Sequence, residues 1–109
     1  MIVVTGRVQI PAANRARFMQ IAVEMCRRSR EDEGCIGYRV YADLEQDEHY
    51  VFVEEWADEK ALQQHFAQEH TGAFMAELPG LLGAAPDALF HTVRDTRRLD
   101  PASGLVPVG

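Results

Sequence analysis

Apolar and polar residues recur along the chain with two different periods, and each period predicts a type of element. Residues 2–10 are rich in β-branched side chains, which predicts a strand that Pro11 ends. From about residue 14 to residue 30, apolar side chains recur at steps of three and four, which predicts an amphipathic helix. Its apolar face comprises Phe18, Ile21, Ala22, Met25 and Cys26. Gly34 then ends the helix, because glycine takes the left-handed conformation at low cost.

Two further apolar segments, residues 35–42 and 49–57, predict strands. The acidic segment 43–48 between them has the composition of a turn, so the two strands are expected to pair as a hairpin with a longer loop. Asp58 is a suitable N-cap for a helix that continues to about Gln68.

The remaining elements complete one small domain. Thr71 is a candidate cap for a further short helix, and residues 87–94 predict a fourth strand. The order strand, helix, strand, strand, helices, strand predicts an α+β domain of the ferredoxin-like kind over residues 1–95. Such a domain has a four-stranded antiparallel sheet with its helices on one face. Residues 96–109 show no periodicity and are expected to form an extended or disordered tail.

Both faces of the predicted sheet carry apolar side chains. In the third strand Tyr50, Phe52 and Trp56 share one face, whereas Val51 and Val53 share the other. Helices on one side of the sheet cover only one of these faces. We therefore expect the other face to pack against a second copy of the chain, which gives a homodimer.

Composition and charge restrict the partners of this domain. A chain of 109 residues fits one domain, and its net charge of −6 disfavours nucleic acid, which requires a cationic surface. The nearest approach to a cationic patch is Arg27, Arg28 and Arg30, and the acidic residues 31–33 follow it at once. No segment has the roughly 20 apolar residues of a membrane span, and the two cysteines are too few for a disulfide scaffold. These features favour a cytoplasmic protein.

Three short motifs resemble the antibiotic biosynthesis monooxygenase family, whose members form dimeric α+β barrels. They are Glu33-Gly34-Cys35-Ile36-Gly37-Tyr38, Glu54-Glu55-Trp56, and Leu62-Gln63-Gln64-His65-Phe66 followed by Glu69-His70 and Phe74. The resemblance covers residues 2 to about 95. It implies a monooxygenase that needs neither metal nor flavin and that oxidises a small aromatic or quinol substrate with molecular oxygen. In such a reaction a phenol loses a proton, and its anion passes an electron directly to oxygen.

The same family also includes haem-degrading enzymes, a sugar-phosphate isomerase and proteins of unknown role. Haem cleavage in relatives uses an asparagine on the first strand, and residues 2–10 contain none. Two alternatives stay open: an isomerase of a small carbonyl or sugar-phosphate compound, and a non-catalytic dimeric binding or stress module. A cationic corner in the pocket favours the isomerase, and a pocket filled by its own side chains favours the non-catalytic module.

His65, Trp56 and Arg39 are the candidate catalytic residues. Histidine titrates near neutral pH, so His65 is a candidate base for a phenolic proton. Trp56 offers a flat apolar wall and an indole N–H donor, and Arg39 offers a cation that stabilises a phenolate. Each has a structural alternative: a core histidine bonded to backbone or Glu54, a core tryptophan, and an arginine paired with an acid.

Four further residues are candidates for substrate binding. Phe52 and Phe66 are expected in the core or the pocket wall, and His70 at the pocket mouth or on the surface. Glu54 shares the face of Trp56, where it either orients His65 or contacts the dimer partner. His65 and His70 are five residues apart and fit no single helical face, so we expect no metal site.

Overall fold

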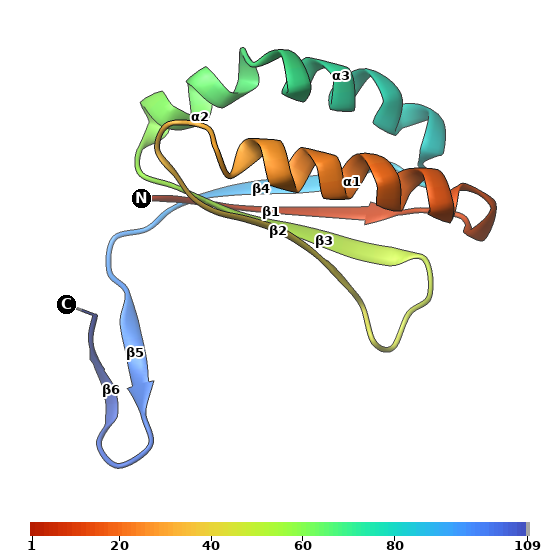
Figure 1. Ribbon diagram of the computed structural model, residues 1–109. Coiled ribbons are helices and arrows are strands. Elements are labelled where there is room, and N and C mark those ends of the chain that lie inside the picture. The colour runs from red at the N-terminus through yellow and green to blue at the C-terminus, as the bar shows by residue number, and fades with distance from the viewer. Residues whose placement is uncertain (109) are drawn as a thin grey trace.

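The computed structural model describes residues 1–108, and Figure 1 shows a main sheet with helices on a single side. The sheet contains four strands in the order β2-β3-β1-β4, and every neighbouring pair is antiparallel. The strands are β1 (Ile2–Gln9), β2 (Cys35–Ala42), β3 (His49–Trp56) and β4 (Asp87–Thr92). This topology confirms the predicted α+β, ferredoxin-like class.

Three α-helices cover one face of the sheet (Figure 1). They are α1 (Arg15–Ser29), α2 (Glu59–Phe66) and α3 (Glu69–Glu77), with short 3₁₀ helices at Ala12–Asn14 and Leu78–Leu81. Asp58 caps α2 as predicted, because its side chain accepts a hydrogen bond from the backbone N–H of Ala61 at 2.8 Å. Among residues 1–108, no helix has the length and apolar content needed to cross a membrane.

Thr71 does not cap the third helix, so that prediction is wrong. The helix begins at Glu69, its N-cap residue is Gln68, and Thr71 lies buried in the first turn. The physical reason is local: only Ala67 and Gln68 separate the two helices, and of these only Gln68 has an extended backbone. This early restart turns Thr71 and His70 toward the interior of the protein.

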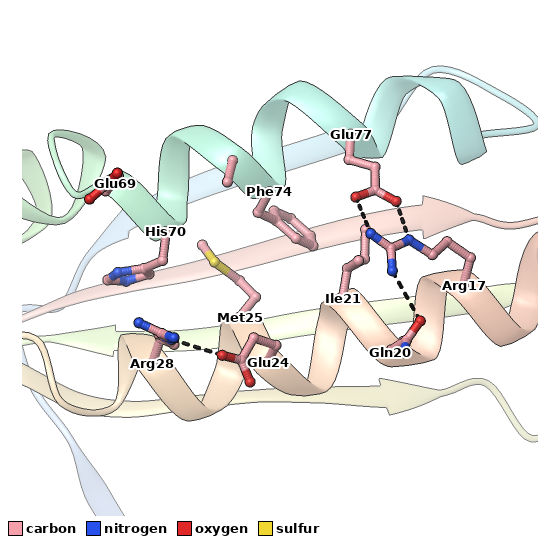
Figure 2. Close-up of a pocket in the computed structure, with 11 residues that line it drawn as sticks. Arg17, Gln20, Ile21, Glu24, Met25, Arg28, Glu69, His70, Phe74 and Glu77 are labelled. Carbon is pink, nitrogen blue, oxygen red and sulfur yellow. Dashed lines mark hydrogen bonds and ion pairs between the residues drawn. The ribbon is translucent and has the colours of Figure 1, made fainter.

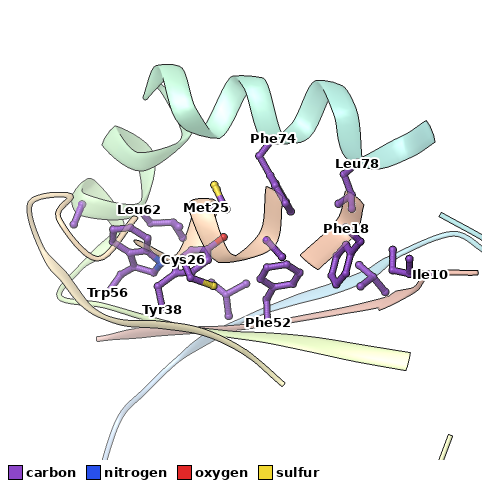
Figure 3. Packing of buried hydrophobic residues seen from close by; sticks show 14 residues of the cluster. Ile10, Phe18, Met25, Cys26, Tyr38, Phe52, Trp56, Leu62, Phe74 and Leu78 are labelled. Atoms are coloured by element: carbon purple, nitrogen blue, oxygen red, sulfur yellow. The ribbon is translucent and has the colours of Figure 1, made fainter. Parts of the chain in front are cut away.

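The core lies between the sheet and the helices (Figure 3). Trp56, Phe18 and Ile10 are fully buried, and Phe52 packs edge-on against both Phe18 and Phe74. Strand alternation places Tyr38, Phe52, Glu54 and Trp56 on the helix side of the sheet. One carboxylate, that of Glu54, therefore points into an otherwise aromatic layer.

The opposite face of the sheet has no covering element within the described part of the chain. In its middle row Val53 on β3 lies between Thr5 on β1 and Arg39 on β2. Val3 and Val51 share this face with Val53. The apolar residues predicted on both faces are thus present, and in a single chain only one face is buried.

The C-terminal residues form a second, smaller sheet. β5 (Arg97–Asp100) pairs with β6 (Gly104–Pro107), where an extended or disordered tail was expected. Gly104 has a φ of +92°, which permits the tight reversal between the strands. With two strands of four residues each, this hairpin is too short for its alternation to stand out in the sequence. Leu99 and Leu105 are 69% and 65% exposed, and the hairpin projects from the domain (Figure 1).

Candidate functional site

His65 lies at the centre of a buried polar cluster beneath the helices. Its ring is 2% exposed, and Nδ1 lies 2.8 Å from Oδ2 of Asp32 and 3.3 Å from the Thr71 hydroxyl. Asp32 follows α1 in the turn that leads to β2. A carboxylate only accepts hydrogen bonds, so the Nδ1–H of His65 donates to Asp32. Nε2 then carries the lone pair of the neutral ring.

His70 reaches the same carboxylate from the next helix. Its Nε2 lies 3.1 Å from Oδ2 of Asp32, and the two imidazole rings are 6.0 Å apart. As expected from the five-residue spacing, His65 and His70 share no helical face, but their rings nevertheless lie close together. The two histidines lie on α2 and α3 respectively, and the break between these helices brings both rings to Asp32. The acidic partner of the His65 ring is Asp32. Backbone and Glu54, the two partners considered from the sequence, do not take this role.

Burial sets the protonation state of His65. Desolvation lowers the pKa of this histidine below its usual value of 6.5, and the carboxylate of Asp32 opposes that shift. The pKa stays below the usual value because burial dominates, so the ring is neutral at pH 7. A neutral imidazole held through Nδ1 has the form that a general base requires.

Trp56 packs against His65, but its N–H is already used. The two rings are 4.5 Å apart, and the indole N–H donates to Oε1 of Glu54 at 3.0 Å. Trp56 is therefore a buried wall of the cluster, and in this geometry its N–H is not free to bind a substrate anion. Glu54 orients Trp56 rather than His65, and it faces the helices rather than the bare sheet face where a dimer partner is expected.

Glu54 is a carboxyl group in an unfavourable environment. Burial raises its pKa above the usual value of 4.5, and hydrogen bonds from Trp56 and Tyr38 only partly offset this effect. Burial likewise raises the pKa of the Tyr38 hydroxyl, with the Glu54 charge adding to the shift. The Tyr38 ring lies 5.6 Å from that of His65, so this second polar group adjoins the first.

The two predicted phenylalanines have different environments. Phe52 is buried in the core, and it packs between other aromatic rings. Phe66 is half exposed on α2, with its ring 5.9 Å from His65 and 6.2 Å from Phe90 on β4. Phe90 is also half exposed, and its pairing with the buried Val4 places it on the helix side of the sheet. Phe66 and Phe90 thus form an accessible aromatic surface beside His65.

Arg39 does not join this cluster. It lies opposite Val53 on the bare face of the sheet, whereas His65 packs on the other face. The strand alternation that placed Arg39 with Gly37 and Tyr41 was correct. Alternation along β2, however, does not determine which of its two faces the helices cover. In a single chain Arg39 is therefore not positioned to hold an anion next to His65.

A groove of about 680 Å³ runs between α1 and α3 (Figure 2). His70 and Glu69 line one end, and Phe74 and Met25 line the floor. Its two arginines are both paired, Arg17 with Glu77 and Arg28 with Glu24. The groove therefore offers no unpaired cation to a phosphate group.

The cysteines do not supply a nucleophile to this site. Burial raises the pKa of Cys26, and burial together with Asp32 raises the pKa of Cys35 to about 11. Both thiols are therefore protonated at neutral pH, and a protonated thiol is a poor nucleophile. Both cysteines are free in this structure.

Sequence reasoning missed Asp32, Thr71, Tyr38 and Phe90 as members of the site. Asp32 directly precedes the Glu33-Gly34-Cys35 motif. This motif is the local sequence signal that the turn between α1 and β2 has a defined structure. The contact of Asp32 with His65 spans 33 residues, and the contact with His70 spans 38. Helical and strand periodicity predict only contacts between residues close in sequence, so they do not predict contacts between residues this far apart in the chain.

Comparisons with known proteins identify the family of this chain. The family model described as antibiotic biosynthesis monooxygenase matches residues 1–77. The putative monooxygenase YcnE of Bacillus subtilis is 28% identical over 89 residues, which are 82% of this chain and 94% of YcnE.

Two solved structures share the fold. A putative antibiotic biosynthesis monooxygenase from Deinococcus radiodurans has a TM-score of 0.83 at 23% identity, covering 88% of this chain and 95% of its own. A mutant of SnoaB from Streptomyces nogalater, described as a cofactor-independent oxygenase, has a TM-score of 0.76 at 19% identity. That match covers 87% of this chain and 94% of SnoaB. On the strength of the family match, this chain belongs to the antibiotic biosynthesis monooxygenase family.

Proposed function

We propose that this protein is a cofactor-independent monooxygenase that oxidises a small aromatic or quinol substrate with molecular oxygen. The observation that carries the proposal is the Asp32–His65 pair beside the accessible surface of Phe66 and Phe90. A flat apolar ring stacks on aromatic side chains, and a hydroxyl on that ring then lies near the histidine.

His65 acts as the base in this proposal. Asp32 holds the Nδ1–H and stabilises the imidazolium that forms when Nε2 accepts a phenolic proton. The resulting phenolate is electron-rich and passes one electron to oxygen, and the two radicals combine to form a peroxide at a ring carbon. The peroxide takes the proton back from His65, and the hydroperoxide then loses water to give the quinone. Trp56 supports the position of the His65 ring, and Glu54 fixes Trp56.

Because His65 is tightly packed, a substrate reaches it only after a side chain moves. At 2% exposure, the ring is sealed in the free protein, so substrate binding has to move Phe66 or a neighbouring side chain on α2. Movement of one half-exposed aromatic side chain is a modest rearrangement. Two relatives support the reaction class, since YcnE is described as a putative monooxygenase and SnoaB as a cofactor-independent oxygenase.

We also propose that the working unit is a homodimer. The bare sheet face carries Val3, Val51 and Val53, and burial of such a face is the usual reason for two-fold association. The projecting hairpin supports the same assembly, because an isolated two-stranded hairpin is marginally stable in water. Packing of Leu99 and Leu105 on the partner would stabilise it.

One observation favours a second candidate, the non-catalytic binding module. Trp56 and His65 fill the space between α2 and the sheet, as a structural histidine would. The isomerase alternative for a sugar phosphate has less support, because both arginines that line the groove are already paired with glutamates.

Oxygen-uptake screening against a panel of quinols and phenols separates these functions. With a metal chelator present, we expect at least one electron-rich hydroquinone to drive oxygen consumption above its rate of autoxidation. A panel without any enzyme-dependent uptake, together with quinol binding detected by tryptophan fluorescence, would support the binding module instead. Trp56 is a suitable reporter because it is the only tryptophan of the chain.

A further inference from the structure

We propose that Asp32, His65 and His70 form a binding site for a divalent transition-metal ion of the Zn²⁺ or Co²⁺ class. The three residues come from the turn after α1, from α2 and from α3. Each offers one ligand atom, and these three atoms all lie within 4.8 Å of one another. Two imidazole nitrogens and one carboxylate oxygen are a donor set that zinc and cobalt bind readily.

The spacing of the donor atoms suits an ion of this size. Zinc lies about 2 Å from nitrogen and oxygen ligands, so its ligands in a tetrahedron are roughly 3.3 Å apart. Here the two histidine nitrogens lie 2.8 Å and 3.1 Å from the Asp32 oxygen. The two histidine nitrogens themselves lie within 4.8 Å of each other, so side-chain rotations that bring them closer would let all three donors contact one ion.

The surroundings of the three side chains limit the access of water to the donor atoms. The side chains of His65 and Asp32 are 2% and 9% exposed, so both donors are shielded from competing water. The Thr71 hydroxyl lies 3.3 Å from Nδ1 of His65 and offers a neutral oxygen at the edge of the site. A fourth coordination position remains for water.

The ion has a route to the site. The side chain of His70 is 18% exposed and lines the groove between α1 and α3 (Figure 2). Glu69 and Glu24 line the same groove, and Arg28 is paired with Glu24. A cation that enters the groove therefore meets His70 first and reaches Asp32 behind it.

Metal binding and base catalysis exclude each other at His65. When a metal holds Nδ1 of a neutral imidazole, the proton moves to Nε2, and the ring then has no lone pair to accept a phenolic proton. The site would therefore be inhibitory for the oxygenase. This consequence rests on the proposed function, whereas the binding itself does not.

Cobalt titration of the chelator-treated, dialysed protein tests the site. We expect one Co²⁺ per chain with ligand-field absorption bands in the visible, and a melting temperature that rises with Co²⁺ concentration. His70→Ala and Asp32→Asn should each weaken binding at least tenfold, since loss of even an outer-shell partner costs roughly 10–100-fold. His91→Ala is the matched control, because β-strand register places His91 opposite Val3 on the bare sheet face. It should bind like the wild type.

The site is disproved if the wild type shows no Co²⁺ bands, or if His70→Ala and Asp32→Asn, verified as folded by circular dichroism, bind Co²⁺ as tightly as His91→Ala. Activity provides the separate test of inhibition. If Co²⁺ binds with the expected variant pattern but leaves oxygen uptake unchanged, the metal site stands and the role of His65 as the base is wrong. Inhibition with the same concentration dependence as the absorption bands supports both.

Discussion

At the scale of single residues, burial rather than residue type decides what each polar group does. His65 and Glu54 both lie beneath the helices, and desolvation shifts both pKa values toward the neutral form. For the histidine this shift produces a neutral ring with Asp32 on Nδ1. For the glutamate it produces a carboxylate that the folded state holds at a cost, with only the hydrogen bonds of Trp56 and Tyr38 to offset it.

Replacement of Glu54 by glutamine should therefore stabilise the protein at neutral pH. Because the folded-state pKa of Glu54 lies above its usual value of 4.5, the folded protein binds more protons than the unfolded chain between these two pKa values. The contribution of Glu54 to stability is thus largest below pH 4.5 and falls as pH rises through the folded pKa. Glutamine has no such penalty and keeps an oxygen for the Trp56 N–H.

Thermal unfolding as a function of pH measures this effect. We expect Glu54→Gln to melt above the wild type at pH 7, and the difference to shrink as the pH is lowered toward 4.5. Glu55→Gln is the control, since strand alternation places that carboxylate on the opposite sheet face. An equal or lower melting temperature for Glu54→Gln at pH 7 would mean that Glu54 is not a destabilising charge.

The sequence predicted the residue-scale chemistry only in part. Strand periodicity placed Glu54 and Trp56 on one sheet face, and helical periodicity placed His65 on the inner face of its helix, but the expected contact of His65 with Glu54 is absent. The partners were not predictable, since Asp32 lies in a turn and reaches His65 only through the tertiary fold. The proposed role of Arg39 was not predictable either. Its charge suits an anion, but it lies on the other side of the sheet from His65.

At the scale of elements, the turn between α1 and β2 positions the Asp32 carboxylate. Gly34 ends this turn with a φ of +81°, and a Cβ added there would lie 2.4 Å from the Cβ of Ala61 on α2. Its carbonyl also accepts the N–H of Ala57 at 2.8 Å, which ties the turn to the end of β3. Glycine is required here for both conformation and close approach.

Gly34→Ala should destabilise the fold by on the order of 2 kcal/mol or more, because it combines left-handed strain with a contact that neither backbone can relieve easily. Chemical denaturation measures the change in free energy of unfolding. Gly72→Ala on α3 is the matched control, since nothing lies within 4 Å of the added methyl group. Alanine in a helix should stabilise by about 0.5–1 kcal/mol. Equal effects of the two substitutions would argue against the packing of this turn on α2.

The elements themselves were largely predictable, because each of the four main strands and the long helix has a clear period. The predicted strand 35–42 and helix 14–30 correspond to β2 (Cys35–Ala42) and α1 (Arg15–Ser29). The start of α3 was not predictable from residue preferences, since Gln68 caps it without a side-chain hydrogen bond. The hairpin of β5 and β6 was missed because its strands are short, Pro101 follows the first of them, and Pro107 is the last residue of the second.

At the scale of the whole molecule, two surfaces lack a partner in the described part of the single chain, namely the bare sheet face and the C-terminal hairpin. A specific dimer usually buries more than roughly 1,000 Å² in total, which a four-stranded sheet face can supply. Val53 is central to this surface, since it lies between β1 and β2 partners.

Val53→Lys should therefore convert a dimer into a monomer, because it would bury an unpaired charge next to Arg39. Met19→Lys is the control, since Met19 is 47% exposed on α1, away from the sheet. Sedimentation at micromolar concentration measures both variants. A wild type that sediments as a monomer, or a Val53→Lys variant that remains dimeric, would contradict the proposed assembly.

The most direct test of the whole account is the rate of oxygen uptake by His65→Ala with a quinol that the wild type oxidises. If His65 accepts the phenolic proton, the variant should turn over at least about 10²-fold more slowly, the usual effect of losing a general base. Circular dichroism and thermal melting should show that the fold survives. A folded variant that consumes oxygen at the wild-type rate would contradict the proposal that His65 is the base, and His65 would then be a structural residue of the core.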